Sequence, residues 1–298
     1  MSGTLKGWII LEETIMQNVA LIGIDLGKHS FHIHCQDQSG NVLLRKKFTR
    51  TKLMQFLATC RSSVVVMEAC GGAHFMARCI SDIGHEAKLI SPQFVRPFVK
   101  SNKNDFVDAE AICEAASRPS MRFVRPRTET QQAMRALHRV RESLIRDKVK
   151  TINQIHAFLL EFGISLPTGD AVIKRLSLVL AEHETPEYLS RLLMKLHVHY
   201  LYLIEQITEL ESELNQSIKA DATAQRIMTI PGVGTITASL LSSQLGDGKQ
   251  FSCNRILQHP QDLFPDNTVP VVNQRCWGSA NEVTKICVGY LFSVPARS

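Results

Sequence analysis

The sequence predicts an α/β protein in which a mixed β-sheet with helices on both faces is followed by two long helices and a shorter helical segment. Three observations support this fold class. Short apolar, β-prone runs alternate with helical stretches in the first third of the chain, apolar side chains recur at three- and four-residue steps over 128–162 and 186–218, and a Pro-Gly-Val-Gly turn precedes a last helical pattern. The 298 residues are 44% apolar and 21% charged, which is typical of a globular protein with a real core.

The expected sheet begins with three consecutive strands. Residues 19–25 form a short apolar run, and residues 31–37 and 41–49 follow it, joined by the turn signal Ser39-Gly40-Asn41. The next expected elements are a helix over 51–60, a strand over 63–68, a helix ending near 83, a strand over 86–90 and a helix over 105–117. The resulting order β-β-β-α-β-α-β-α is the one expected of the ribonuclease H fold.

The helical part is expected to contain a pair of long helices, and the sequence leaves two arrangements open for them. They form either an antiparallel hairpin within one chain or a coiled coil between two chains, because residues 203–218 have heptad character. Residues 227–247 predict a helix, a turn and a second helix from Thr235, which resembles a helix-hairpin-helix motif. Backbone N–H groups near Gly232 and Gly234 are expected to hold a DNA phosphate, and an ordinary tight turn is the alternative.

Basic residues gather where the helical part begins. The net charge of the chain is +6, and ten cations between residues 118 and 150 face only three anions. A run of charge is usually only a solvated helix face. Because most of these cations are arginines, we expect a surface that follows phosphates, with Arg135 and Arg139 among its contacts.

Four carboxylates stand at positions where this fold would bring them together. Asp25 ends the first strand, Glu68 ends the fourth, and Asp105 and Asp108 share one face at the start of the last helix of the sheet domain. Each alone is a weak signal, since an Asp at a helix start often only caps it. Together they predict a site for two Mg²⁺ or Mn²⁺ ions, because four clustered negative charges need cations, and such a pair cleaves or transfers a phosphodiester.

The segments that carry these residues resemble a known family. "GIDLGKHSFHIHCQDQSGNVL", "MEACGGAHFMAR", "LISPQFVRPFVKSNKNDFVDAEAICEA" and "IPGVGTITASLL" are similar to the DEDD transposases of the insertion-sequence one-hundred-and-ten family, which are also described as recombinases guided by a bridge RNA. The resemblance covers about residues 16–255. It implies a RuvC-like domain, a coiled-coil domain and a C-terminal transposase domain with a serine nucleophile.

Carried over by motif, the resemblance assigns the following residues. The catalytic and metal-binding carboxylates are Asp25, Glu68, Asp105 and Asp108. Contacts to the nucleic-acid backbone are expected from Lys100, Asn102, Lys103 and Asn104. The implied partners are DNA, a guide RNA and further copies of the chain in a dimer or tetramer.

The end of the chain departs from the family. The expected segment of the form R-D-F-A-A-S-x-G-L-V-P-R is missing after Phe251. A consistent choice of synonymous codons for "RILQHPQDLFPDNTVPVVNQRCWGSANEVT" gives "DFAASTGLVPRQYSTGGKPTLLGISKRGN" in the neighbouring frame. We therefore expect that one base was lost near the Arg255 codon. The family serine would then be encoded across the His259 and Pro260 codons, so this copy would be defective.

These observations define the expected domains. They are a non-native leader over 1–15, a RuvC-like domain over 16–125, a helical arm over 126–219, the start of a transposase domain over 220–255 and an out-of-frame tail over 256–298. We expect a cytoplasmic protein without a membrane segment, because "WIIL" is too short to span a bilayer and the eight cysteines follow no disulfide or zinc spacing. We expect no metal role for His29, His32 and His34, because no carboxylate or thiol stands at ligand spacing from them.

The sequence leaves two other classes of function open. "IGIDLGK" also resembles the first phosphate strand of actin-like and sugar-kinase ATPases, but no second Gly-rich phosphate loop is visible late in the chain. A nucleic-acid-binding module without catalysis is the other class. The function of a structure-specific nuclease is closely related to that of a transposase.

Overall fold

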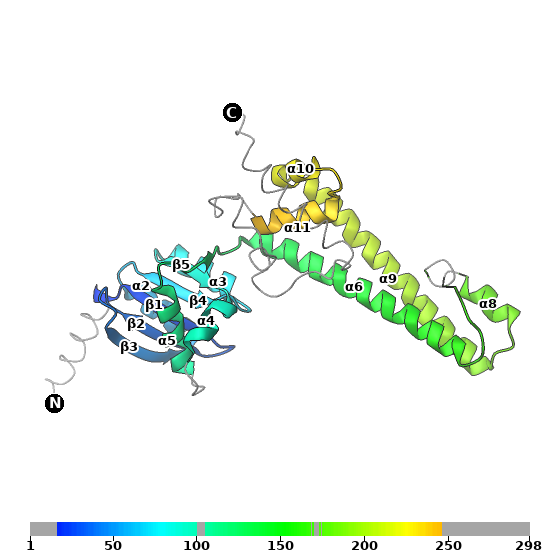
Figure 1. Ribbon diagram of the computed structural model, residues 1–298, viewed down its shortest axis with the longest axis horizontal. Coiled ribbons are helices and arrows are strands. Elements are labelled where there is room, and N and C mark those ends of the chain that lie inside the picture. Colours follow the sequence, from blue (N-terminus) through cyan, green and yellow to red (C-terminus); the bar gives the residue numbers. More distant parts are fainter. Residues whose placement is uncertain (1–16, 100–104, 168, 170–172, 174, 246–298) are drawn as a thin grey trace. The chain divides into compact units, whose positions relative to one another are not determined.

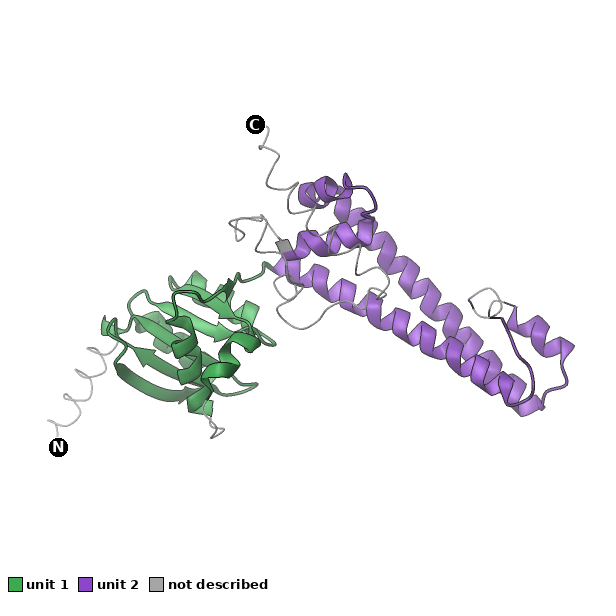
Figure 2. Cartoon of the chain, viewed as in Figure 1, with its two compact units in different colours: residues 1–128, 255–269 green, residues 129–254, 270–298 purple. Residues whose placement is uncertain are grey.

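The computed structural model describes residues 17–99, 105–167, 169, 173 and 175–245. The chain divides into two compact units at the junction of Thr128 and Glu129 (Figure 2), and each is described by itself. This junction lies three residues after the domain boundary expected from the sequence. The predicted leader and the predicted out-of-frame tail lie outside the described residues.

The first unit is a six-stranded mixed sheet with the order β3-β2-β1-β4-β5-β6. β1 is antiparallel to β2 and parallel to β4, and β4 is parallel to β5. The strands are β1 (Leu21–Leu26), β2 (Phe31–Gln36), β3 (Val42–Phe48), β4 (Val64–Glu68), β5 (Glu86–Ile90) and β6 (Phe123–Val124). The predicted succession of the first five strands along the chain and the mixed sheet are confirmed, whereas β6, a two-residue edge strand antiparallel to β5, was not expected.

Helices cover both faces of this sheet (Figure 1). They are α2 (Arg50–Thr59), α3 (Ala73–Asp82), α4 (Pro92–Val95), the 3₁₀ turn η1 (Arg96–Phe98) and α5 (Asp105–Ala116). Side chains of a strand point alternately to its two faces. Ile22 and Ile24 therefore enter the core beneath α2 and α3, while Leu21 packs in the second core beneath α4 and α5.

The face beneath α5 carries the functional side chains. Alternation places Asp25 on the same face as Leu21, and Glu68 on the same face as Val64 and Val66. Ile24 pairs with Met67 in the parallel ladder, so Asp25 and Glu68 are the next residues of two neighbouring strands. The carboxyl ends of parallel strands meet at one edge of a sheet, and this edge is where a site is expected.

Close packing of α5 on β1 depends on Gly23. A Cβ atom at this position would lie 2.5 Å from the carbonyl oxygen of Ala109 and 2.6 Å from Sγ of Cys113. The missing side chain therefore lets the helix approach the strand directly. Because Ala109 follows Asp108, this contact also fixes how near the first turn of α5 lies to Asp25.

The second unit is built on two long helices that lie side by side, α6 (Glu129–Leu160) and α9 (Glu187–Lys219) (Figure 1). They run in opposite directions, because Arg141 pairs with Glu211 near one end while Ile155 and Leu159 pack with Leu193 toward the other. The hairpin within one chain is thus what the structure shows. Coiled-coil packing between chains stays a prediction.

Three short helices complete the described part of this unit. They are α8 (Leu176–Glu182), α10 (Ala222–Met228) and α11 (Thr235–Leu245). The predicted helix, turn and helix around Pro231 are present, and α11 begins at Thr235 as expected. α10 begins at a cap, because the carboxylate of Asp221 accepts hydrogen bonds from the backbone N–H groups of Thr223 and Ala224. α8 was not expected.

Candidate metal centre

Three of the four predicted carboxylates form a close group. Each of Asp25, Asp105 and Asp108 offers an oxygen, and these oxygens lie within 4.8 Å of one another. Asp25 lies near the end of β1, and the other two come from the first turn of α5. They share a face because they are three residues apart on a helix.

Glu68 lies beside this group, close enough for the charges of Asp25 and Asp108 to act on it, but it is not one of the three residues whose oxygens lie within 4.8 Å of one another. Burial is the largest cause of the raised pKa of its carboxyl group. The charges of Asp25 and Asp108 raise this pKa further, while Arg96 lowers it. The strand ends and the helix start therefore bring all four predicted carboxylates to one edge of the sheet.

The electrostatics of the site favour a bound cation. Burial raises the pKa of Asp25 above its ordinary value, and the neighbouring charges of Asp108 and Asp105 raise it further, while His32 lowers it. Each of these upward shifts reflects the cost of keeping several negative charges together away from water. A divalent ion would remove that cost, because carboxylate oxygens are the ligands that Mg²⁺ and Mn²⁺ prefer.

The donor set and its spacing fit such an ion. Bonds of about 2.0–2.6 Å from a hard cation to oxygen place two ligands of one ion at most about 4–5 Å apart. The 4.8 Å limit of the Asp25, Asp105 and Asp108 group lies within this span. The residues present can therefore hold a divalent cation.

This arrangement predicts how the stability of the metal-free protein depends on pH. The folded-state pKa values of Asp25 and Glu68 are raised, so the folded state binds protons more tightly than the unfolded chain does. Their contribution to stability is present below the ordinary carboxyl pKa of about 4 and is lost as pH rises through the raised values. As the pH of an EDTA solution rises from about 4 to about 8, we expect the melting temperature of the wild-type chain to fall. The melting temperature of an Asp25→Asn, Glu68→Gln variant should fall less.

Thermal melts followed by circular dichroism between pH 4 and 8 would measure this difference. Adding Mn²⁺ at pH 7 should raise the melting temperature of the wild type and leave the variant unchanged, because only the wild type binds the ion. Parallel pH profiles for the two proteins in EDTA would contradict the predicted repulsion.

One residue of the site was missed by sequence reasoning. His32 is 4% exposed, and its Nδ1 lies 3.5 Å from Oδ2 of Asp105 and 3.9 Å from Oδ2 of Asp25. The expectation that no carboxylate stands near it was wrong. His32 is paired with Asp25 across the antiparallel ladder, so the carboxylate comes from the neighbouring strand and not from the local sequence.

The residues predicted to bind nucleic acid fall into three groups. Lys100, Asn102, Lys103 and Asn104 lie outside the described residues. Arg139 is exposed on α6, whereas Arg135 is buried with 7% exposure, which argues against a direct phosphate contact from its side chain. Gly232 has a positive φ of 86°, and a Cβ atom added at Gly232 or at Gly234 would meet nothing within 4 Å.

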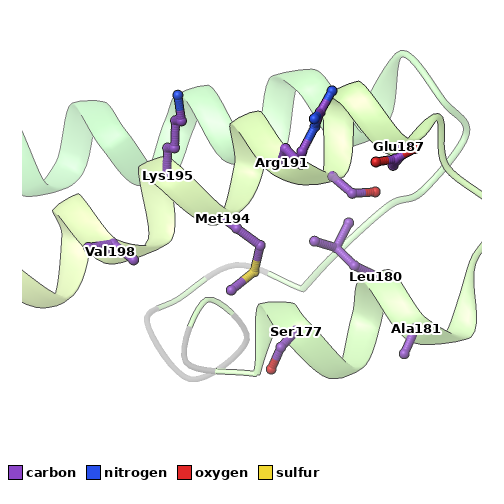
Figure 3. Close-up of a pocket in the computed structure, with 9 residues that line it drawn as sticks. Ser177, Leu180, Ala181, Glu187, Arg191, Met194, Lys195 and Val198 are labelled. Carbon is purple, nitrogen blue, oxygen red and sulfur yellow. The ribbon is translucent and has the colours of Figure 1, made fainter.

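A separate hollow lies in the second unit, between α8 and α9 (Figure 3). Leu180 and Met194 point toward each other across it, and Arg191 and Lys195 lie along its α9 side. It has no counterpart among the predicted site residues. In the described part of the chain, no helix has the length and apolar character needed to cross a membrane.

Comparison with known proteins gives the family. A transposase family model, that of the IS110-type DEDD transposases, matches residues 22–164. This match includes Asp25, Glu68, Asp105 and Asp108.

Curated relatives agree with this match. The transposase of insertion sequence element IS1328 from Yersinia enterocolitica is 69% identical over 250 residues, which cover 84% of this chain and 75% of the relative. The transposase of insertion sequence element IS1111A from Coxiella burnetii is 39% identical over 254 residues, covering 84% and 70%. A probable family 20 transposase from Pseudomonas aeruginosa is 39% identical over 242 residues, covering 80% and 72%. The carboxylate edge of the sheet thus lies in a chain that belongs to the IS110 family of DEDD transposases.

Proposed function

We propose that this transposase cleaves and transfers DNA strands with the help of divalent cations, Mg²⁺ or Mn²⁺, held by Asp25, Glu68, Asp105 and Asp108. The observation that supports it best is the approach of three carboxylate oxygens to within 4.8 Å at one edge of the sheet. When bound, paired ions of this kind activate an attacking oxygen and stabilise the leaving oxygen of a phosphodiester.

The carboxylates that would hold the cation differ in burial. Asp25 and Glu68 stand on the sheet and are partly buried, so their positions are fixed by the core beneath them. Asp105 is exposed, with 65% of its side chain accessible, and so lies on the solvent side of the group. A nucleic-acid strand would reach the site from that side.

The helices of the second unit offer further proposed contacts to the nucleic acid. Exposed cations such as Arg139 and Lys150 on α6 suit contacts to phosphates. The turn before α11 suits a second contact, since the open space at Gly232 and Gly234 lets a phosphate approach the N–H groups of the helix start. Lys100, Asn102, Lys103 and Asn104 are retained as proposed contacts on the strength of the family resemblance.

The remaining partners are proposed from the resemblance alone. They are a guide RNA encoded by the element, and other copies of the chain in a dimer or tetramer. A protein that acts on the DNA of a bacterial cell would work in the cytoplasm. We also propose that residues 256–298 are translated out of frame, so that this copy lacks the family serine and cannot complete recombination.

One experiment tests the activity and the defect together. The chain as it stands and a version with one base restored at codon 255 would be incubated with element ends, target DNA and the RNA transcribed from the flanking DNA. We expect metal-dependent DNA binding from both proteins, and recombinant product only from the restored one. Sequencing of the gene around codon 255 checks the lost base directly.

The alternative outcomes are distinct. Full recombination by the unrestored chain would overturn the proposed defect, and product formation in EDTA would overturn the metal requirement. ATP hydrolysis without DNA cleavage would favour the actin-like alternative. Unchanged activity of the restored protein after Asp105→Ala and Asp108→Ala would favour a binding module without catalysis.

A further inference from the structure

The imidazole of His32 is buried against the carboxylate group. The side chain is 5% exposed, and its Nδ1 is a buried polar atom that has no hydrogen-bond partner among the described residues. The same atom lies 3.5 Å from Oδ2 of Asp105 and 3.9 Å from Oδ2 of Asp25. A buried polar atom without a partner is costly, so its position between two carboxylates needs an explanation.

The ring is held in this position from two sides. β2 places His32 opposite Asp25 in the antiparallel ladder, on the face covered by α5. Phe106, which follows Asp105 on α5, meets the imidazole edge-on with ring centroids 4.8 Å apart and an angle of 74° between the planes. Strand and helix thus direct Nδ1 toward the space that the two carboxylates share.

The distances from Nδ1 of His32 to the two carboxylate oxygens suit ligands of one shared ion better than a direct hydrogen bond. Neither separation is a hydrogen bond of ordinary length, which is about 2.7–3.2 Å. Two ligands that bind one ion at about 2.0–2.3 Å can lie about 3–4.5 Å apart. Both His32 distances, 3.5 and 3.9 Å, fall within that interval.

We propose that Nδ1 of His32 is a ligand of a divalent cation bound by Asp25 and Asp105, and that this nitrogen makes the site prefer Mn²⁺ over Mg²⁺. The inference rests on the proposed metal-dependent function and deepens it. Mg²⁺ strongly favours oxygen ligands, whereas imidazole nitrogen suits transition metals, which bind mixed nitrogen and oxygen sets more tightly. A set of carboxylates alone suits both ions.

His34 provides a matched control on the same strand. It is also buried, at 1% exposure, and alternation places it on the same face as His32. Its register partner is Gly23 and not Asp25, and its Nε2 lies 3.1 Å from Nε2 of Gln36. A His34→Gln variant therefore removes a buried imidazole from the same sheet without touching the carboxylates.

The test is pulsed EPR of Mn²⁺ bound to the full chain, because a directly bound nitrogen gives a ¹⁴N coupling. We expect that coupling in the wild type, and we expect it to change to the ¹⁵N pattern when the protein is made with ¹⁵N-histidine. It should persist in His34→Gln and vanish in His32→Gln. Competition titrations should show at least about a tenfold loss of Mn²⁺ affinity in His32→Gln, with the affinity for Mg²⁺ changed far less.

The outcomes separate this inference from the function on which it rests. Mn²⁺ that binds the wild type but not an Asp25→Asn variant, and shows no histidine coupling, overturns the role of His32 and leaves the metal site standing. Mn²⁺ binding that Asp25→Asn does not weaken overturns the proposed function itself. The isotope measurement uses the unaltered sequence, so a variant that fails to fold does not prevent a decision.

Discussion

Replacing Asp25 by asparagine is expected to abolish metal binding and to lower DNA strand cleavage by the frame-restored protein by about 10²–10³-fold. A metal ion supplies several kcal/mol of transition-state stabilisation, and each 1.4 kcal/mol corresponds to about a factor of ten in rate. Asp25 is the carboxylate that links the sheet to the α5 pair, because its oxygen lies within 4.8 Å of those of Asp105 and Asp108. Removing its charge leaves the two helix carboxylates without their partner on the strand.

The same substitution should raise the stability of the metal-free protein. The raised pKa of Asp25 shows that its charge is unfavourable in the folded state, and a neutral amide relieves the repulsion from Asp108 and Asp105. Loss of activity together with a higher melting temperature in EDTA would distinguish a functional carboxylate from a structural one. Isothermal titration with Mn²⁺, a DNA cleavage assay and thermal melts measure the three effects.

The control for this prediction is Asp82→Asn, which removes a carboxylate of the same kind from the exposed end of α3. It should leave metal affinity, cleavage and metal-free stability unchanged. An Asp25→Asn protein that still binds Mn²⁺ with wild-type affinity would show that the close group of carboxylates does not hold the metal.

Replacing Gly23 by alanine is expected to destabilise the first unit by about 1–3 kcal/mol and to weaken Mn²⁺ binding at least about tenfold. The new Cβ atom would lie 2.5 Å from a backbone oxygen of α5 and 2.6 Å from Sγ of Cys113. Ordinary packing requires about 3.5 Å, so the helix must move away from the strand by about 1 Å. That movement carries Asp105 and Asp108 away from Asp25.

Gly71→Ala is the matched control, because a Cβ atom there meets nothing within 4 Å and the residue follows β4 close to Glu68. It should change neither stability nor metal affinity. Chemical denaturation and Mn²⁺ titration would measure the two effects of Gly23→Ala separately. A Gly23→Ala protein that is destabilised but keeps full metal affinity would show that the packing of α5 is structural only.

Much of the first unit could be predicted because its signals are local. The apolar run of β1, the turn at Gly40 and the helical spacing of α2 each follow from a few neighbouring residues. The order of these elements then restricts the sheet to few arrangements, since hairpins join neighbours and parallel crossovers have one hand. Asp25, Glu68 and the α5 pair could be grouped on this basis from the sequence alone.

Other features depend on contacts between segments that are distant in sequence. β6 has two residues, too few to show a period, and it exists because Leu89 and Ile90 of β5 offer it a partner. The charge pattern around Arg135 predicted a surface cation, but tertiary packing buries its side chain. Neither outcome follows from a pattern of charge or hydrophobicity along the chain.

His32 is the clearest case of a site residue that local sequence patterns could not predict. Alternation along β2 places it correctly on one face of a strand, but the residues close to it in the sequence offer no carboxylate at ligand spacing. Its carboxylate neighbours come from β1 and from α5, the second of which lies far along the chain. The sequence by itself determined which residue types stand at the ends of which strands and helices, because those properties arise from local periodicity and turns. Only the tertiary structure decided that an imidazole joins the carboxylates, because that depends on strand register and on how closely α5 packs over Gly23.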